Sequence, residues 1–562
     1  MKLSAIAGLL FLVMGLAVQP GSAAPPLYPG KLGVEAAGDA FVDIARQAYR
    51  WEKPDGHGAW AAVKPEDVDE HGWPRTDCRW IGDSRPCAEW TGEIDDPDGY
   101  RLERSGTYKG SFHGKAALSA AEGPFSISNQ GYDSAKNLTT FELTIPKAGP
   151  NVGLTVVQFS DTRRSATAPA NSGVTDFKLI RPGYPADTKQ LFTDQYLRCL
   201  GSAAFSTIRF MNVTETNGNA AWGKDHTRTL SWSGRKLPED ASVEVMAALN
   251  KRDGWPWEYV IALCNEANKD MWLNIPMCAD DDYVRQLAML IKANLKPGLN
   301  IYIEHSNEVW NFGFIQYAWN KARATEEMKE GTPKYNFDKV NNGEIWAQRR
   351  HAQKLEDAVQ IFGDAFGKAE INKRIRGVLA GWTPEPEGFF IVGRLSGMLD
   401  YLKATGADPK ESIDAISIAM YYGGKAATGE AGTESYSVDQ IINDMRGEMD
   451  HQLAQRKAMV ELAKRFGLPG GVCAYESGPD IGGGRKSNIA NRIRAVRDPR
   501  QAELFKRNLS DCFWNLGGNL AMQFTLAGPY SRFGAWGLTD DIAKPDRNGL
   551  FGAARELVGT GK

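Results

Sequence analysis

The chain has 562 residues, which predicts three to four domains at about 150 residues per domain, or fewer if one of them is a large barrel. Hydrophobic residues make up 42% of the chain and aromatic residues 10%, so the composition excludes a disordered protein. A formal net charge of -3 supplies no general field for attracting nucleic acid or an anionic membrane surface.

The N-terminus has the pattern of a secretory signal. Lys2 precedes an apolar run from Ala5 to Val18, and Gly21–Ala24 offers small residues for cleavage. A membrane anchor is the alternative, but this run is shorter than the roughly 18 apolar residues of a span, and no other segment reaches that length. We therefore expect residues 1–23 to be a signal peptide, and the mature protein to be secreted or periplasmic with no membrane span.

If the protein is exported, its cysteines can form disulfides. Cys78 and Cys87 lie close together in an apparently irregular stretch, where a short disulfide is expected in an oxidising compartment. The remaining cysteines are expected to be buried small hydrophobic residues: Cys199, Cys264, Cys278, Cys473 and Cys512. The chain has neither a C-x-x-C pair nor an H-E-x-x-H motif and only seven histidines, so we expect no metal and no other cofactor.

The first region, residues 25–170, is predicted to form strands. Phe141, Leu143 and Ile145 alternate with polar neighbours, which is typical of a half-buried strand. A Gly-Pro pair then separates this strand from the next candidate, residues 152–159. We expect an all-β accessory domain here, resembling a sandwich.

After residues 165–173 the pattern changes, and short apolar runs alternate with long amphipathic ones, as in β/α units. Eight such runs are strand candidates: Val174–Ile180, Phe205–Phe210, Met271–Ile275, Asn300–Glu304, Arg376–Ala380, Ala415–Met420, Gly471–Tyr475 and Asn519–Thr525. The count predicts a (β/α)8 TIM barrel over residues 174–562. A doubly wound open sheet is the alternative, but no G-x-G-x-x-G follows an early strand.

Helical spacing predicts helices between these strands. The clearest one begins after Asp280, a good N-cap residue, and ends before Pro297. The run Asp280–Asp282 could also suggest a calcium site, but helix capping explains it with fewer assumptions. The other expected helices are Trp257–Ala267, Glu344–Phe362, Phe390–Leu402, Val438–Phe466 and Gln501–Leu516.

Two motifs stand at the ends of predicted strands, where the catalytic residues of TIM barrels gather. The fourth strand ends in Ile-Tyr-Ile-Glu-His-Ser-Asn-Glu-Val-Trp-Asn, residues 301–311, and the seventh in Gly-Val-Cys-Ala-Tyr-Glu-Ser-Gly, residues 471–478. Glu308 and Glu476 are therefore predicted to face one another across the barrel mouth. Two carboxyl groups so placed suit glycoside hydrolysis, in which one protonates the leaving oxygen and the other attacks, or activates water at, the anomeric carbon.

With these motifs, residues 174–545 resemble the clan A glycoside hydrolases, which are retaining (β/α)8 enzymes with Asn-Glu at the fourth strand and Glu at the seventh. The resemblance implies that Glu308 is the acid/base, that Glu476 is the nucleophile and that Asn307 binds the sugar 2-hydroxyl. A departure is Val309, which replaces the Pro common after Asn-Glu in several member families.

Two further positions match the same pattern. Arg209, in Thr-Ile-Arg-Phe at the second strand, resembles an Arg that supports the nucleophile, and an Arg there would favour the anionic form of Glu476. Tyr421, after the sixth strand, resembles a Tyr or His position beside the nucleophile. His305 could tune Glu308 or contact sugar, but it points away from Glu304 if the strand continues and could equally be packed.

Aromatic side chains near strand ends are candidate floors for sugar rings, because flat rings offer a large apolar area. They lie just beyond strands four, five, six and eight: Trp310, Trp382, Tyr422 and Trp536. Weaker cleft candidates are Asn274, His226 and Arg228. The sequence therefore predicts a secreted retaining glycosidase for β-linked polysaccharide or oligosaccharide. The alternative is a non-catalytic carbohydrate-binding or cell-surface protein on the same barrel.

Overall fold

The computed structural model describes residues 30–561 except for 38, 83–103, 122, 148–153, 218–228, 244–253, 332, 383–392 and 484–486. The predicted signal peptide, residues 1–23, lies outside the described residues.

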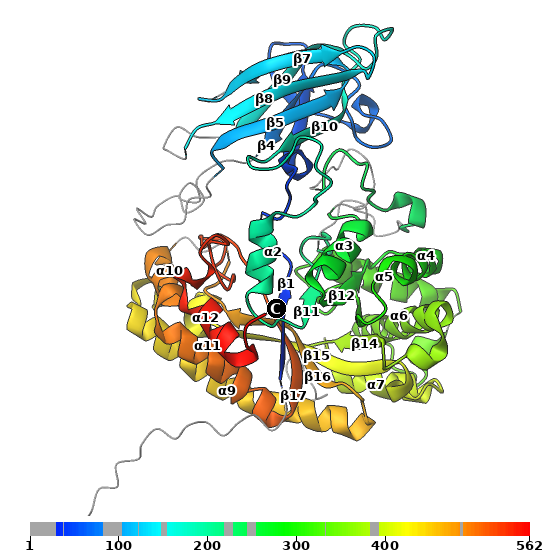
Figure 1. The fold of residues 1–562 in the computed structure, drawn as a ribbon. Coiled ribbons are helices and arrows are strands. Elements are labelled where there is room, and N and C mark those ends of the chain that lie inside the picture. Colours follow the sequence, from blue (N-terminus) through cyan, green and yellow to red (C-terminus); the bar gives the residue numbers. More distant parts are fainter. Residues whose placement is uncertain are drawn as a thin grey trace, which may run out of the picture.

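Eight parallel strands close into a barrel (Figure 1). In order around the barrel they are β1 (Lys31–Glu35), β11 (Thr207–Arg209), β12 (Asp270–Ile275), β13 (Ile301–His305), β14 (Ile375–Ala380), β15 (Ile413–Tyr422), β16 (Gly471–Pro479) and β17 (Gly518–Gln523). Strand β1 pairs with both β11 and β17, which closes the sheet. Because helices alternate with these strands along the chain, the fold is TIM-barrel-like.

Helices surround the barrel strands (Figure 1). They are α2 (Asp194–Gly201), α3 (Trp257–Ala267), α4 (Asp281–Asn294), α5 (Ile315–Lys329), α6 (Gly343–Phe366), α7 (Leu395–Ala404), α8 (Gly424–Thr428), α9 (Val438–Phe466), α10 (Ile489–Arg497), α11 (Arg500–Ser510) and α12 (Gly549–Val558). The carboxylate of Asp280 accepts a hydrogen bond from the backbone N–H of Tyr283 at 2.7 Å, which is the predicted N-cap of α4. None of the described helices combines the length and apolar character needed to cross a membrane.

The first barrel strand differs from the prediction. The run Val174–Ile180 forms β10 (Thr175–Ile180), which pairs antiparallel with β5 (Gly106–His113) outside the barrel, and β1 takes the barrel position instead. Both runs are short and partly apolar, so their side chains do not reveal which neighbour each one pairs with. The other seven predicted strands occupy positions two to eight of the barrel.

Two antiparallel sheets are inserted between β1 and β11 and lie beyond one end of the barrel (Figure 1). One sheet has the order β10-β5-β8-β7 and the other β3-β2-β4-β9-β6. Their remaining strands are β2 (Ala48–Pro54), β3 (Trp60–Ala62), β4 (Cys78–Gly82), β6 (Lys115–Ala121), β7 (Ser126–Asp133), β8 (Leu138–Ile145) and β9 (Thr155–Arg163). The chain therefore starts the barrel, leaves it and returns, which differs from the predicted division into residues 25–170 and 174–562.

The two antiparallel sheets share an apolar core. Phe141, Leu143 and Ile145 are buried on β8, in the alternation that the sequence predicted. Phe177 of β10 packs within 5.3–6.4 Å of four aromatic rings, those of Trp51, Trp80, Phe141 and Phe159. Aromatic side chains of the two sheets thus pack against one another, edge to face, in one core.

Six of the seven cysteines lie within the described residues, and all six are buried. Cys78 lies in β4 as a free thiol, which does not support the predicted Cys78–Cys87 disulfide, and Cys87 lies outside the described residues. The burial predicted for the other five is confirmed.

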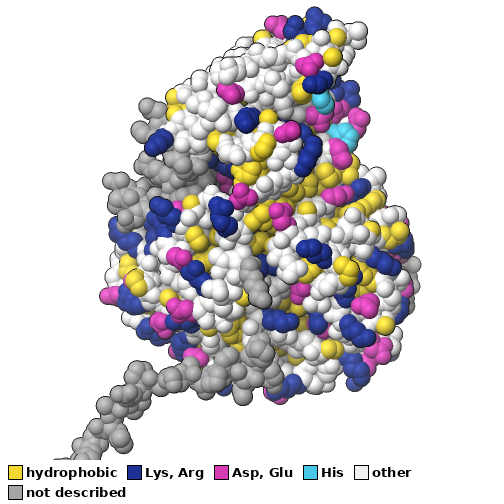
Figure 2. Space-filling view, in the orientation of Figure 1, with side chains coloured by type: hydrophobic (Ala, Val, Ile, Leu, Met, Phe, Trp, Pro, Cys, Tyr) yellow, Lys and Arg dark blue, Asp and Glu magenta, His cyan; other side chains and the backbone are white. Residues whose placement is uncertain are grey.

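Acidic and basic side chains are interspersed over the face of the molecule shown in Figure 2, without one dominant sign. This distribution matches the small net charge of the chain.

Replacing Phe177 by Ala tests the placement of β10. The substitution leaves a cavity among four aromatic rings, so we expect the free energy of unfolding of the antiparallel sheets to fall by about 3–5 kcal/mol. Hydrogen exchange followed by mass spectrometry should show faster exchange in peptides of these sheets. Ser128→Ala, exposed on β7, is the control and should change stability by less than about 0.5 kcal/mol. Faster exchange confined to barrel peptides would contradict the placement.

Candidate active site

One buried guanidinium gathers the carboxyl groups at the C-terminal ends of the barrel strands. Arg209 ends β11 and is fully buried. Its Nη1 donates to Glu476 Oε1 at 2.8 Å, and its Nη2 donates to Asn307 Oδ1 at 2.7 Å. Nη2 also donates to Glu304 Oε2 at 2.9 Å, and Nη1 lies 3.5 Å from Glu35 Oε2. Because these groups are removed from water, their charge-assisted hydrogen bonds are stronger than exposed ones.

Glu476 lies on β16, the seventh barrel strand, between two hydrogen-bond donors. Besides Arg209, the hydroxyl of Tyr421 donates to Glu476 Oε2 at 2.8 Å. Burial and the neighbouring carboxylate raise the pKa of Tyr421 well above its usual value, so the phenol remains a donor. Each oxygen of Glu476 therefore accepts a hydrogen bond, one of them from a cation.

Glu308 follows β13, the fourth barrel strand, and has a different environment. Its carboxyl accepts hydrogen bonds from Asn311 Nδ2 at 2.9 Å and from the hydroxyl of Tyr475 at 3.2 Å. Burial, and then the charge of Glu476, raise the pKa of Glu308 to about 7. Its φ of 42° is uncommon for a residue other than Gly, and such strain concentrates at functional sites. Near neutral pH, Glu308 can therefore hold a proton, while Glu476 is paired with the cation Arg209.

The sequence reasoning missed two buried carboxyl groups. Glu304 accepts hydrogen bonds from Trp272 Nε1 and Asn274 Nδ2, both at 2.9 Å. Glu35 accepts one from the backbone N–H of Asn212 at 2.7 Å, and burial raises its pKa to about 8. A charged residue at the inward position of a barrel strand was a signal for Glu304. No comparable signal existed for Glu35, because β1 was not predicted as a barrel strand.

Several predicted residues line one cleft of about 620 Å³. Its walls include Glu308, Trp310, Trp382 and Tyr421. The rings of Trp310 and Trp382 meet edge to face with centroids 4.4 Å apart, and Trp382 is 48% exposed. The indole N–H of Trp536 donates at 3.2 Å to Asp480, which also lines the cleft.

Two other predicted residues point elsewhere. Tyr422 is fully buried with its hydroxyl 3.4 Å from Gln501, because neighbouring residues of a strand face opposite sides and Tyr421 takes the inner one. Asn274 is also fully buried; it supports Glu304 and the backbone carbonyl of Ser306 and does not form part of the cleft wall. His226 and Arg228 lie outside the described residues.

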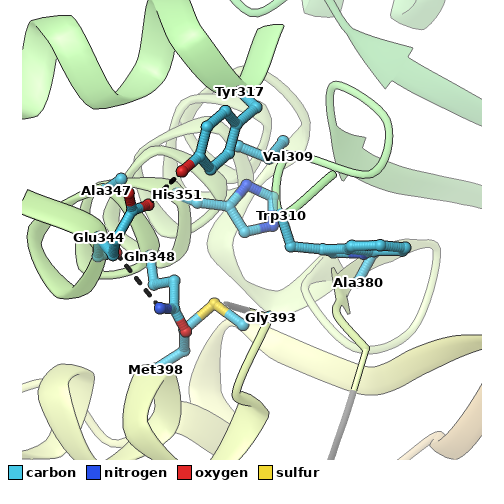
Figure 3. A pocket seen from close by; sticks show the side chains of 10 residues that line it. All are labelled: Val309, Trp310, Tyr317, Glu344, Ala347, Gln348, His351, Ala380, Gly393 and Met398. Atoms are coloured by element: carbon cyan, nitrogen blue, oxygen red, sulfur yellow. Dashed lines mark hydrogen bonds between the residues drawn. The ribbon is translucent and has the colours of Figure 1, made fainter. Parts of the chain in front are cut away.

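His305 was predicted either to act at the site or to be packed, and the structure shows it packed against another histidine. Its Nδ1 lies 2.9 Å from Nδ1 of His351 on α6. Burial and His351 lower the pKa of His305 well below its usual value, so the ring stays neutral. His351 and Trp310 line one small cavity (Figure 3), so the histidine pair lies behind Trp310, a residue of the cleft wall.

Within the described part of the chain, no group of three or more His, Cys, Asp or Glu side chains is arranged to hold a metal ion. Comparison of the sequence with protein-family models and with curated proteins found no match. The functional inference therefore depends on the site itself.

Glu476→Gln tests the coupling of the two carboxyl groups. Removing the negative charge removes the repulsion that disfavours ionisation of Glu308, so we expect the pKa of Glu308 to fall below about 7. Carbon-13 NMR of labelled glutamate side chains measures it directly. Glu448→Gln, which neutralises another carboxyl of the cleft wall, is the matched control and should shift this pKa less. An unchanged Glu308 titration in Glu476→Gln would show that the two groups are not coupled.

Proposed function

We propose that the protein is a glycoside hydrolase that cleaves β-linked polysaccharide or oligosaccharide by a retaining double displacement. The observation that carries the proposal is that two carboxyl groups, at the ends of the fourth and seventh barrel strands, have different electrostatic surroundings. Glu308 has a pKa raised to about 7, whereas Glu476 is paired with Arg209 at 2.8 Å. Retaining hydrolysis needs this combination of a proton donor and an ionised nucleophile.

The two steps follow from these states. Glu308 donates its proton to the glycosidic oxygen while a Glu476 oxygen attacks the anomeric carbon, which expels the leaving sugar and forms a glycosyl ester. Esterification removes the charge of Glu476, so the pKa of Glu308 falls and its carboxylate becomes suited to accept a proton from water. That water then attacks the anomeric carbon and releases Glu476.

Asn307 directly precedes Glu308 in the chain and shares Arg209 with Glu476. Its Oδ1 accepts from Arg209 and its Nδ2 donates to Asn217 Oδ1 at 3.2 Å, which fixes the orientation of the amide. In the proposed mechanism this amide binds the 2-hydroxyl of the sugar, a contact that strengthens in the transition state.

A non-catalytic carbohydrate-binding barrel is the competing hypothesis. Such a protein would use the aromatic cleft, but it has no need for a proton-carrying carboxyl beside an ion-paired one. The raised pKa of Glu308, a carboxyl that lines the cleft, favours the enzyme. Export to the periplasm or the medium, where a polymeric glycan would be met, is part of the proposal.

Glu308→Gln and Glu476→Gln test the residue roles. Loss of the general acid should lower kcat/KM by about 10²- to 10⁴-fold, with a smaller loss for an aryl glycoside whose leaving group needs no proton. Added azide should restore turnover in Glu308→Gln by attacking the glycosyl ester, whereas Glu476→Gln should stay inactive on both substrates. Near-ultraviolet circular dichroism serves as the folding control. Full activity in either folded variant would remove that residue from the mechanism.

The pH dependence of kcat/KM tests the raised pKa. Because the general acid must carry its proton, kcat/KM should fall as pH rises through the Glu308 pKa of about 7 and reach a tenfold decrease per unit above it. Initial rates measured on one glycan between about pH 4 and about pH 10 give kcat/KM below and above this pKa. A plateau that extends unchanged to about pH 9 would contradict the assignment of Glu308 as the acid.

A further inference from the structure

Exposed apolar side chains concentrate at the barrel mouth. Among the described residues, large hydrophobic side chains with marked exposure are Met289, Phe312, Phe337, Trp382 and Phe533. Phe312, Trp382 and Phe533 follow β13, β14 and β17, and so lie on the loops at the end of the barrel that carries the two carboxyls. Exposed apolar surface gathered around a cleft indicates a surface that a ligand covers.

One aromatic arm adjoins the proton donor. Trp310 is two residues after Glu308, and its ring contacts that of Trp382 at 4.4 Å. The side-chain amide of Gln455, on α9, donates to the backbone carbonyl of Trp382 at 2.8 Å and fixes its position. Because Glu308 protonates the departing oxygen in the proposed mechanism, this arm faces the leaving-group side.

A second aromatic arm adjoins the nucleophile. Tyr421, which donates to Glu476, packs edge to face on Phe524 with centroids 6.4 Å apart. Phe524 in turn contacts Trp536 at 5.8 Å, and both rings are partly exposed. This arm therefore faces the part of the substrate that becomes attached to Glu476.

The cleft extends from the first arm to residues that contact the second. It is lined both by Trp382 and by Asp480, whose carboxylate accepts the hydrogen bond from Trp536. An enzyme that removes terminal sugars needs a wall that closes one side of the carboxyl pair, whereas aromatic rings here continue on both sides.

We propose, on the basis of the proposed function, that the enzyme cleaves internal bonds of a glycan chain. Trp382, which packs on the buried Trp310, binds the sugars on the leaving-group side, and Phe524 and Trp536 bind those on the other side. Flat rings suit this role because they cover the apolar faces of successive sugars.

The charge of the cleft further defines which kind of glycan it binds. Among the described residues, its walls carry Glu430, Glu448 and Asp480 but a single cation, Lys425, whose ammonium lies 3.3 Å from Glu430. An excess of carboxylates repels anionic sugars. The glycan is therefore one without acidic groups.

The experiment combines two measurements on the wild-type protein with three variants. The wild type is screened on β-glucan, mannan, xylan and galactan, and viscosity and reducing ends are followed together on the polymer it hydrolyses. Internal cleavage should lower viscosity while few reducing ends have formed. A carboxymethylated form of the same polymer should be cleaved more slowly than its hydroxyethylated form.

The variants separate the two arms. An aryl glycoside carries no sugar on the leaving-group side, so Trp382→Ala should lower kcat/KM at least about tenfold more on the polymer than on the aryl glycoside. Trp536→Ala should lower both values to a similar extent. Met289→Ala, on an exposed face of α4, is the control and should change neither.

The outcomes distinguish this inference from the proposed function. If the wild type releases nothing from any glycan or aryl glycoside, the proposed function fails. If it releases only mono- or disaccharide without an early fall in viscosity, it is a hydrolase that acts on chain ends, and the inference is overturned. Equal losses on both substrates in Trp382→Ala would overturn the assignment of the arms.

Discussion

The structure of the site depends on the burial of Arg209. A guanidinium without access to water must be surrounded by acceptors, since leaving it unpaired would cost several kcal/mol. Glu35, Glu304, Glu476 and Asn307 supply these acceptors. Their strands, β1, β13 and β16, are thereby fixed to β11 at the end of the barrel where the cleft opens.

The same interaction separates the states of the two proposed catalytic carboxyls. Glu476 makes a direct ion pair with Arg209, whereas Glu308 lies outside the direct contacts of the guanidinium and keeps only neutral donors, Asn311 and Tyr475. Two groups of the same chemical type thus have different electrostatic surroundings, and burial beside Glu476 raises the pKa of Glu308. The proposed division of labour between acid and nucleophile follows from that difference.

The inserted sheets are linked to this arrangement by the chain itself. Glu35 is the last residue of β1, directly before the insertion. Arg209 is the last residue of β11, the first barrel strand after the insertion. Just after β1, Asp39 forms ion pairs with Arg104, which precedes β5, and with Arg181, which follows β10. The carboxyl of Glu35 and the guanidinium of Arg209 therefore meet across 174 positions of sequence at 3.5 Å.

Periodicity and strand-end position by themselves determined much of this protein. Seven barrel strands, the helices Trp257–Ala267 and Val438–Phe466, and the places of Glu308 and Glu476 follow from them, because side-chain spacing is a local property. Only the tertiary structure decided that Lys31–Glu35 replaces Val174–Ile180 in the barrel, since strand pairing is a choice between distant partners. It also decided that Glu35 and Glu304 share Arg209, and that Tyr422 and His305 face away from the cleft. Arg209 and Glu476 lie 267 positions apart, and their pairing was expected only from the family resemblance, because a contact of that span has no local sequence pattern.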